Sequence, residues 1–217
     1  MSHEIVVVDY HKGNLLSVAR SVSSVGAEVE VSDDPRTISE AQGIILPGVG
    51  SFEDAMSYLR SSGQADAIVR SIQRGVPFLG ICLGLQLLFD RGTERTTNAW
   101  GNGLVPGLGL LDGSVTLLES TQLKVPHVGW DQIHLTAQGR QCPLFVDVAE
   151  GSNVYYTHSY ATSNDIDDSV VAARTHYVRT FAGAVWQDNI FGVQFHPEKS
   201  SSTGMRILSN FVRYVRG

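Results

Sequence analysis

Cysteine is scarce in this sequence, which contains only Cys82 and Cys142 among its 217 residues. Two cysteines can form at most one bridge, so a small domain held together by disulfides is excluded. The residues before the first apolar run, Ile5–Val8, include neither the basic segment nor the cleavage site of a secretory signal. We therefore expect a reduced protein in the cytoplasm. No cysteine and histidine stand at metal-ligand spacing, and no metal site is expected.

Long apolar runs and an excess of basic residues are also missing. No run approaches the roughly 18 apolar residues of a membrane-spanning helix. Acidic residues outnumber basic ones by 22 to 16, giving a net charge of -6. This charge argues against a surface that binds nucleic acid or an anionic membrane. A hydrophobic content of 42% is enough to bury a full core, and we expect a single domain over residues 1–217.

The first half of the chain alternates patterns typical of strands and of helices. Strand-like runs cover residues 5–9, 28–31, 43–46 and 76–81, and helical patterns cover residues 15–25, 65–74 and 83–89. The turn residues 33–35 close the second strand, and Ser51 with Asp54 is a capping box for a helix that begins at Phe52. This alternation predicts a mostly parallel sheet with helices on both faces. Ligands of such sheets bind beyond the carboxyl ends of the strands.

The second half changes character. Predicted strands cover residues 132–135, 154–156, 170–173, 181–186 and 190–194, and only residues 205–215 have a helical pattern. Turn residues separate these strands, so we expect them to pair in antiparallel fashion. The sequence as a whole predicts an α/β fold with antiparallel strands added by the C-terminal half.

Residues 78–89 have the pattern of a nucleophile at a sharp strand-to-helix turn. A strand-like run ends at Cys82, which has Gly80 and Gly84 on either side, the spacing of a nucleophile elbow. Glycines permit the turn, and a sulfur at a helix N-terminus meets free amides and the helix dipole, which favour the thiolate. An unpaired cysteine in an apolar run is more often a small core residue. The glycine spacing makes the nucleophile the better interpretation.

A thiolate nucleophile needs a base, and the sequence offers seven histidines. His196 stands out because it follows an apolar run, residues 190–195, that Pro197 stops. Glu198 comes two residues later. A cysteine, a histidine and a carboxylate form a catalytic triad in its thiol version. From the residues alone, a capped strand end explains His196 equally well.

Three motifs resemble those of the class I glutamine amidotransferases: residues 47–50, 80–86 and 194–198, which occur in the family's order and span the chain. The resemblance implies a flavodoxin-like α/β fold and a glutaminase that needs no cofactor. Cys82 would attack the side-chain amide of glutamine, His196 would move the protons, and Glu198 would orient His196.

The resemblance also assigns residues around the nucleophile. The oxyanion would be stabilised by the backbone amides of Leu83 and of Val49 or Gly50. The residues expected to hold the amino-acid end of glutamine are Gly50, Gln86, Glu94, Ser159 and Tyr160. Gln86 is the one polar residue on an otherwise apolar helix, which independently calls for a partner. A structural hydrogen bond for Gln86, and a solvated charge for Glu94, stay open as alternatives.

Residues 9–15, 126–130, 157–160 and 198–200 resemble, within this family, the glutaminase subunit of imidazole glycerol phosphate synthase. That resemblance implies a heterodimer with a cyclase subunit, which receives ammonia through a channel. The products would be imidazole glycerol phosphate and an aminoimidazole carboxamide ribonucleotide, in histidine biosynthesis. Asn14, Trp130 and Lys199 match positions at that interface. A large aromatic side chain is costly to leave in water unless a partner covers it, although burial of Trp130 in the chain's own core is an equal alternative.

Other functions remain open at this stage. One is another class I glutaminase, such as the one that serves pyridoxal phosphate synthesis. A second is a catalytically inactive regulatory homologue, and a third is a cysteine peptidase built on the same elbow. His11 occupies the place of the first glycine in the family's first motif, which leaves the conformation of that loop open.

Overall fold

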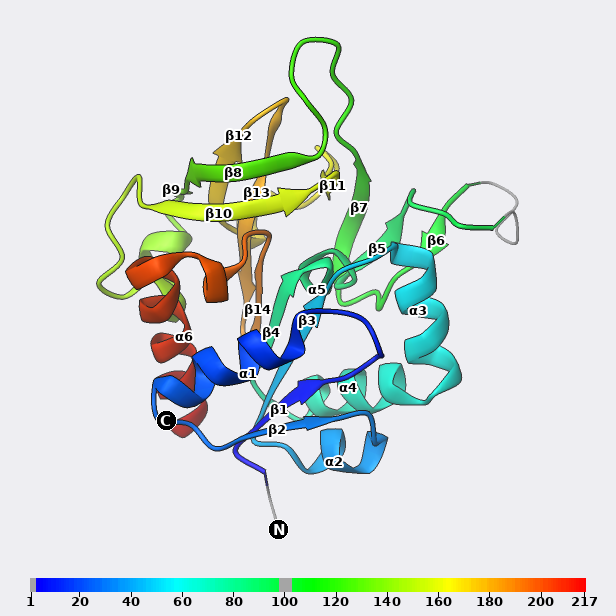
Figure 1. The fold of residues 1–217 in the computed structure, drawn as a ribbon, viewed down its shortest axis with the longest axis vertical. Coiled ribbons are helices and arrows are strands. Elements are labelled where there is room, and N and C mark those ends of the chain that lie inside the picture. The colour runs from blue at the N-terminus through cyan, green and yellow to red at the C-terminus, as the bar shows by residue number, and fades with distance from the viewer. Residues whose placement is uncertain (1–2, 98–102) are drawn as a thin grey trace.

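The computed structural model describes residues 3–97 and 103–217, and its centre is a mixed β-sheet (Figure 1). Within these residues the strand order is β2-β1-β3-β4-β14-β13-β12-β9. Neighbouring strands from β2 to β14 pair in parallel, and β13, β12 and β9 continue the sheet in antiparallel pairing. The strands are β1 (Ile5–Val8), β2 (Val29–Ser32), β3 (Gly43–Gly48), β4 (Phe78–Cys82), β9 (His134–Leu135), β12 (Val171–His176), β13 (Thr180–Gln187) and β14 (Ile190–Val193). The predicted α/β fold, with antiparallel strands added by the C-terminal half, is confirmed.

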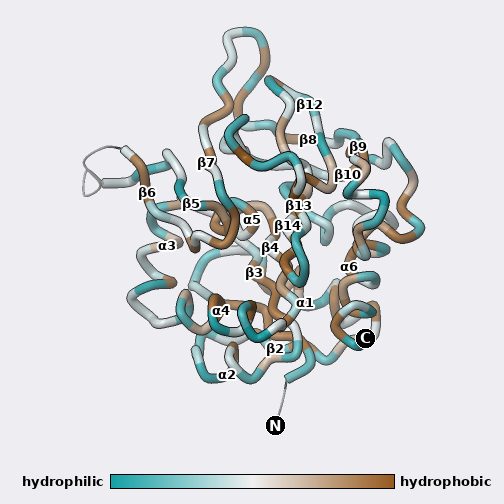
Figure 2. Tube along the Cα trace, turned by 180° about the vertical axis from the view of Figure 1, so that it is seen from behind, coloured by the Kyte–Doolittle hydropathy of each residue, from teal (hydrophilic) through white to brown (hydrophobic). Residues whose placement is uncertain are grey.

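Helices cover both faces of this sheet. These helices are α1 (Leu15–Ser24), α2 (Pro35–Glu40), α3 (Phe52–Ser61), α4 (Gln64–Gln73) and α6 (Ser201–Arg216). Strand β1 shows why both faces need cover, because Val6 and Val8 pack with α2, α3 and α4, whereas Ile5 and Val7 pack with α1 and α6. Each fully buried side chain of this kind contributes about 1.5–3 kcal/mol. Figure 2 shows hydrophobic residues along the central strands and polar ones on the outer loops.

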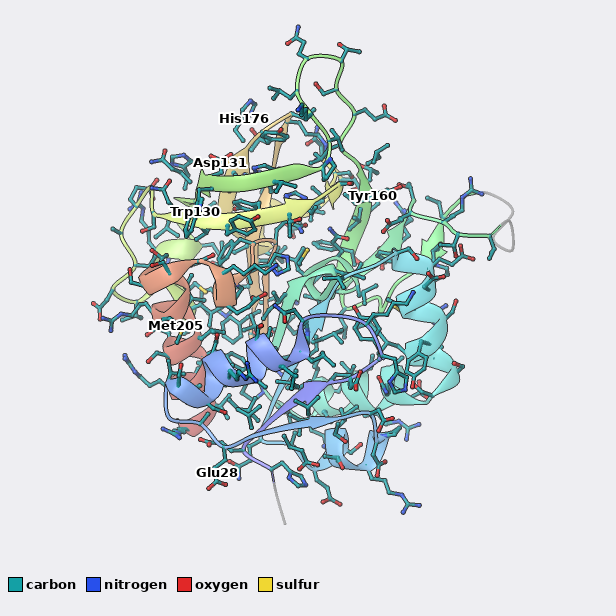
Figure 3. All side chains as sticks on the ribbon, in the orientation of Figure 1. Glu28, Trp130, Asp131, Tyr160, His176 and Met205 are labelled. Carbon is teal, nitrogen blue, oxygen red and sulfur yellow. The ribbon has the colours of Figure 1, made fainter. Side chains whose placement is uncertain are left out.

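A smaller sheet and a two-stranded ribbon complete the fold beside the carboxyl ends of the central strands (Figure 1). The small sheet has the order β11-β7-β5-β6, and the ribbon pairs β8 with β10. Their bounds are β5 (Phe89–Gly92), β6 (Val105–Pro106), β7 (Leu111–Leu117), β8 (His127–Gln132), β10 (Asn153–His158) and β11 (Tyr160–Thr162). Single-turn helices are η1 (Gly139–Gln141), η2 (Pro143–Phe145), η3 (Asp168–Val170) and η4 (Pro197–Lys199). Figure 3 places Trp130 on the ribbon and Tyr160 at the small sheet.

One helix start was predicted from its capping signal, and a second capping signal was interpreted as a turn. Ser51 accepts a hydrogen bond from the amide of Asp54 at 3.2 Å and caps α3, as predicted. The predicted turn at residues 33–35 is instead the start of α2. There Asp34 accepts from the amide of Arg36 at 2.9 Å, and Pro35 occupies the first helical position. Aspartate at the N-cap followed by proline is a helix-start signal.

The helix predicted over residues 83–89 is much shorter than expected. It is α5 (Leu83–Gln86), and the chain then turns into β5, which pairs with β7 and β6. The residues from Leu83 to Phe89 are all buried. Their continuous apolar character reflects burial on every side and does not distinguish a helix from a strand. The predicted strand at residues 132–135 is also divided, between the end of β8 and β9.

Within residues 3–97 and 103–217, no helix is both long and apolar enough to cross a membrane.

Candidate active site

Cys82 lies at a strained turn between β4 and α5. Its backbone has φ 54° and ψ -106°, a conformation that is uncommon and costly for a residue other than glycine. The flanking glycines make the turn possible. A Cβ atom at Gly80 would lie 2.5 Å from the carbonyl oxygen of Gly84, and one at Gly84 would lie 1.8 Å from that of Leu46. Because α5 has a single turn, its dipole contributes less to a thiolate than the longer predicted helix would.

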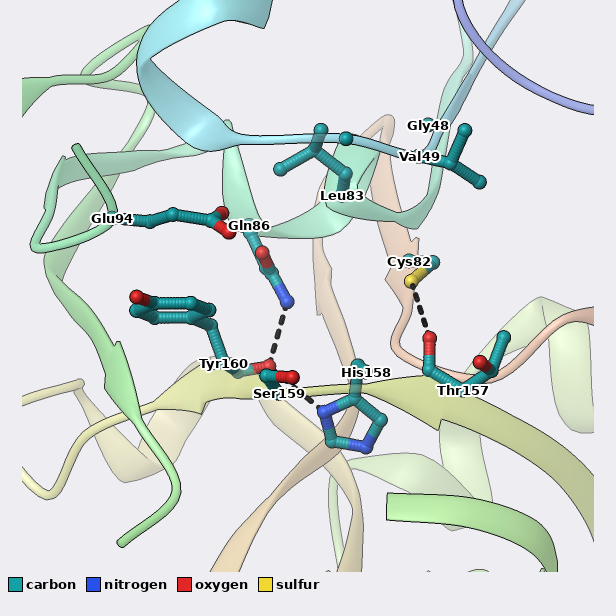
Figure 4. A pocket seen from close by; sticks show the side chains of 11 residues that line it. Gly48, Val49, Cys82, Leu83, Gln86, Glu94, Thr157, His158, Ser159 and Tyr160 are labelled. Atoms are coloured by element: carbon teal, nitrogen blue, oxygen red, sulfur yellow. Dashed lines mark hydrogen bonds between the residues drawn. The ribbon is translucent and has the colours of Figure 1, made fainter. Parts of the chain in front are cut away.

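A cavity of about 230 Å³ opens at this turn (Figure 4). It is lined by Gly48, Val49, Gly50, Cys82, Leu83, Gln86, Glu94, Thr157, His158, Ser159 and Tyr160. The nucleophile, all predicted oxyanion residues and all predicted substrate residues are in this set. The volume is below the range of about 300–1,000 Å³ for drug-sized ligands, so it suits a molecule the size of an amino acid.

His196 and Glu198 lie behind Cys82, just past the carboxyl end of β14, and do not line the cavity. The Nδ1–H of His196 donates to Glu198 Oε1 at 2.9 Å, and their side chains are only 4% and 1% exposed. Burial would lower the pKa of His196, but the neighbouring sulfur of Cys82 and the carboxylate of Glu198 outweigh it and raise this pKa to about 10. The three side chains therefore form one charge-coupled group.

The remaining nitrogen of the His196 ring is poised for proton transfer. Nε2 is buried and makes no hydrogen bond within the described residues. The sulfur of Cys82 lies 3.8 Å from the carbonyl oxygen of Thr157. Because Nδ1 is bonded to Glu198, Nε2 is the ring atom left to exchange a proton with the candidate nucleophile.

Gln86 is the centre of a set of buried amide contacts. Its Nε2 donates to the carbonyl oxygen of Tyr160 at 2.7 Å and to Oε1 of Gln194 at 3.1 Å. Both hydrogens of this amide are then used, so Gln86 presents its oxygen to a ligand. His158 donates from Nδ1 to the same carbonyl of Tyr160 at 2.8 Å. Burial lowers the pKa of His158 to about 3, so this ring is neutral.

Glu94 faces the cavity from the segment after β5. Its carboxylate accepts from the amide of Phe52 at 2.9 Å, and burial raises its pKa. The fully solvated charge considered for Glu94 is therefore not what the structure shows. Glu53 anchors the same segment, because its buried carboxylate accepts from the amides of Thr96 and Thr97 at 2.5 and 2.8 Å.

The amide of Val49 is held by Tyr10. It donates to the Tyr10 hydroxyl at 3.1 Å, and that hydroxyl lies 3.3 Å from the carbonyl oxygen of Val49. Tyr10 is buried, and burial raises its pKa. In this conformation the Val49 amide points to Tyr10, whereas the amide of Leu83 stands at the first position of α5, where no intrahelical partner exists.

Two of the predicted interface residues approach one aromatic ring, that of Tyr155. Trp130 meets Tyr155 edge-on with centroids 6.0 Å apart, and the Lys199 ammonium lies 5.9 Å from the same ring. Trp130 is 55% exposed, so it is not a core residue of this chain. Helix α1, which begins after the exposed Asn14, packs against η4, which contains Lys199. These residues thus belong to neighbouring elements.

The loop before α1 explains the unusual His11. Its backbone has φ 62°, in the left-handed region, which glycine adopts freely and other residues at a cost. The amide of His11 donates to Asp9 Oδ1 at 2.6 Å, which holds the turn. The conformation typical of glycine is therefore kept here by a histidine.

Sequence reasoning missed Gln194, Tyr10 and Glu53 as residues of the site. Gln194 offered a signal, since it is a polar residue at the end of an apolar run and lies inside the third motif. Tyr10 lies inside the motif at residues 9–15, but its contact with Val49 could not be read from it, and Glu53 offered no signal because its role depends on contacts with residues 96–97. In the described part of the chain, no cluster of three or more His, Cys, Asp or Glu side chains could hold a metal ion.

Comparison with known proteins agrees with this geometry. Residues 6–215 match the family model described as glutamine amidotransferase class-I. The chain is 46% identical over 209 residues to the imidazole glycerol phosphate synthase subunit HisH of Gloeobacter violaceus, covering 96% of this chain and 88% of that protein. It is also 46% identical over 212 residues to the protein of the same name from Moorella thermoacetica, covering 98% and 95%.

Solved structures share the fold. A crystal structure of a glutamine amidotransferase superposes with a TM-score of 0.72 at 16% identity, covering 98% of this chain and 99% of the other. The structure of PurLQS from Thermotoga maritima gives a TM-score of 0.70 at 21% identity, covering 99% of each chain. At such identities the likeness concerns the fold alone. The match of the family model over nearly the whole chain, with its close relatives, shows that this protein belongs to the class I glutamine amidotransferase family.

Proposed function

We propose that this chain is the glutamine-hydrolysing subunit of an imidazole glycerol phosphate synthase, acting in histidine biosynthesis in the cytoplasm. The observation that carries the proposal is Cys82 at a strained elbow, beside the buried pair of His196 and Glu198, at the wall of a cavity the size of an amino acid. The relatives named HisH, at 46% identity, support the choice within the family.

The first half of the reaction forms a thioester. With its pKa raised to about 10, His196 holds a proton at neutral pH, and Cys82 reacts as the thiolate. The sulfur attacks the side-chain amide carbon of glutamine, and the carbonyl electron pair moves onto oxygen. The Nε2–H of His196 then protonates the amide nitrogen as the carbon–nitrogen bond breaks. Ammonia leaves, and the glutamyl group remains on Cys82.

The second half releases glutamate. The ring of His196 is now neutral and takes a proton from water, which attacks the thioester carbon. The carbon–sulfur bond breaks, the new carboxylic acid gives its proton to solvent and leaves as glutamate, and the thiolate and the protonated His196 are restored. Glu198 keeps the ring in one orientation and stabilises its positive charge throughout.

Backbone amides stabilise the oxyanion of both halves. The amide of Leu83 is one donor, and the loop at Val49 and Gly50 supplies the other. One such donor is typically worth about 3 kcal/mol in acyl transfer. Because the Val49 amide donates to Tyr10, it has to leave that hydroxyl before it can serve.

The amino-acid end of glutamine is held at the opposite end of the cavity. The carboxylate of Glu94 and the free oxygen of Gln86 are suited to an ammonium group, and the backbone at Ser159 and Tyr160 borders the same space (Figure 4). A carboxylate and an amide oxygen both accept hydrogen bonds, as the α-ammonium of glutamine requires.

The proposed partner is a cyclase subunit that receives the ammonia. Trp130 and Lys199, which both approach the Tyr155 ring, and Asn14 at the start of α1 form the proposed contact. Val128, on the same strand as Trp130, is also 55% exposed. Exposed aromatic and apolar residues gathered on one strand are typical of an interaction surface.

The test compares two nitrogen sources in the reconstituted complex. Cys82→Ala should abolish product formation from glutamine and leave product formation from ammonia intact, because the cyclase chemistry needs no thiol. Survival of both activities would show that the nucleophile is misassigned. Failure of the chain to bind the cyclase, with capture of a different synthase, would instead favour another glutaminase of the family.

A further inference from the structure

Gln194 is a buried polar residue beside the nucleophile. It follows β14 directly, its exposed fraction is 0%, and its amide Nε2 lies 3.6 Å from the sulfur of Cys82. Its backbone amide donates to the carbonyl oxygen of Gly183 at 2.9 Å, so the main chain is fixed at the edge of the strand. The side chain of Gln194 therefore contacts the sulfur from a backbone position that is fixed.

The orientation of the Gln194 amide follows from its neighbours. The carbonyl oxygen of Tyr160 can only accept, so the group of Gln86 that lies 2.7 Å away is its NH₂. That same NH₂ lies 3.1 Å from Gln194, which must therefore present its oxygen. The other end of the Gln194 amide, which faces Cys82, is then its NH₂, and the sulfur is the acceptor.

Two contacts on the sulfur favour opposite protonation states. The carbonyl of Thr157, at 3.8 Å, can accept only from a thiol S–H. The N–H of Gln194 donates to sulfur, and a donor of this kind bonds a thiolate much more strongly than a neutral thiol. Gln194 thus stabilises the ionised nucleophile, whereas Thr157 stabilises the neutral one.

We propose that Gln194 is a catalytic residue, whose amide donates a hydrogen bond to the Cys82 thiolate and which is held in that orientation by Gln86. This inference rests on the proposed glutaminase function. The same hydrogen bonds connect Gln86, which lines the cavity, to the sulfur of Cys82 through Gln194. A ligand that holds Gln86 in place holds Gln194, and with it the donor on the sulfur.

The test measures how fast iodoacetamide alkylates Cys82 as a function of pH, with the label located by peptide mass spectrometry to separate it from Cys142. Gln194→Met removes the donor at similar length, and Gln194→Glu keeps an acceptor for Gln86 but places a carboxylate at the sulfur. A hydrogen bond to a charged group is worth about a factor of ten or more. The pH midpoint of alkylation should therefore rise by about one unit in Gln194→Met and further in Gln194→Glu.

Other titratable groups near the sulfur stay the same in both variants. They are His196, with Glu198 behind it, and Tyr10, whose pKa in turn responds to the charge on Cys82. Glu94 and the neutral ring of His158 line the same cavity and are also unchanged. With the cyclase present, kcat/KM for glutamine should fall about 10- to 100-fold in both variants.

The matched control is Gln64→Glu. Gln64 is equally buried and also donates from its amide to two carbonyl oxygens, those of Asp9 and Asp33, but it lies outside the cavity. This change should lower thermal stability and leave the alkylation midpoint unmoved, which separates a structural role from the proposed one.

An alkylation midpoint unchanged in Gln194→Met would overturn the inference, even if Gln194→Glu raised it, because a charge alone would then explain the shift. The alkylation readout needs neither glutamine nor the partner. A wild-type complex without glutaminase activity would reject the proposed function, whereas an active complex with an unmoved midpoint would reject only the role of Gln194.

Discussion

At the scale of single residues, the reactive centre depends on how Cys82, His196 and Glu198 share charge. The pKa of His196 is about 10 in the folded chain, above its ordinary value of 6.5. A pKa raised by folding means that the stabilisation is fully present below pH 6.5 and is lost as the pH rises through about 10. The protonated ring is therefore a stabilising charge over the physiological range, and in the proposed reaction it is also the proton donor to the leaving amide nitrogen.

Removing the charge of Glu198 tests this arrangement. Glu198→Gln keeps the shape but takes away one of the two groups that raise the pKa of His196, so the ring should lose its proton at a lower pH. We expect kcat for glutamine to fall about 10²- to 10⁴-fold. Stability, followed by chemical denaturation from pH 6 to pH 10, should begin to decline at a lower pH than in wild type. An unchanged kcat would contradict the role of Glu198.

A second residue-scale prediction concerns Tyr10. Tyr10→Phe removes the hydroxyl that accepts from the Val49 amide, which frees the amide to serve as an oxyanion donor. Glutaminase turnover of the isolated chain should rise several-fold, up to about the 10²-fold that one donor can supply. Tyr177→Phe is the control, because that hydroxyl donates to Lys124 outside the cavity. Lower or equal turnover in Tyr10→Phe would show that Tyr10 does not restrain the loop.

At the scale of elements, the turn from β4 into α5 depends on close contact between backbones. The three family motifs stand at the carboxyl ends of three neighbouring strands, β3, β4 and β14, and Gly84 packs against the carbonyl oxygen of Leu46 in β3. A side chain at Gly84 would push α5 away from β3, and with it the nucleophile and the Leu83 amide.

Gly84→Ala should therefore be severely destabilising. Its Cβ would lie 1.8 Å from the carbonyl oxygen of Leu46, and overpacking of this kind typically costs about 1–3 kcal/mol or more. Gly75→Ala is the matched control. Gly75 has φ 90° with no atom within 4 Å of the added Cβ, so only backbone strain of about 1 kcal/mol is expected. Thermal unfolding of the two variants compares these costs, and equal melting temperatures would contradict the packing argument.

Some helices and strands could be predicted from local sequence patterns, and others could not. The strand at Ile5–Val8 and the helix capped by Ser51 were predictable, because burial and capping leave local patterns. The small sheet was not, since β5 is extended only through pairing with β6 and β7, which lie beyond it in the chain. Continuous burial of residues 83–89 then hid the change from helix to strand.

At the scale of the whole molecule, the fold joins residues far apart in sequence. Parallel pairing of β4 with β14, with Ile81 opposite Val193, brings the region of Cys82 next to that of His196. The motifs predict Cys82, His196 and Glu198 as a triad because each stands at or beyond a strand end, and their catalytic roles stay a prediction. Gln194 and Tyr10 could not be assigned in this way, since their roles depend on the direction of an amide in the folded chain.

The exposed surface around Trp130 is the proposed contact between this chain and the cyclase subunit. Trp130→Ala should weaken binding to the cyclase partner by about 30-fold or more, as exposed aromatic anchors do, with little effect on the stability of the isolated chain because the side chain is 55% exposed. Trp186→Ala is the control. Its ring stacks on Phe191 within the chain, so its loss should lower stability and leave binding unchanged. Titration calorimetry with the cyclase measures both, and wild-type affinity in Trp130→Ala would place the interface elsewhere.

The most direct measurement is mass spectrometry of the enzyme quenched with acid during glutamine turnover in the complex. We expect a glutamyl adduct, formed with loss of ammonia, on the peptide that contains Cys82, and none on the peptide that contains Cys142. If the complex turns over glutamine steadily before the quench and the adduct is then found on another residue, Cys82 is not the nucleophile.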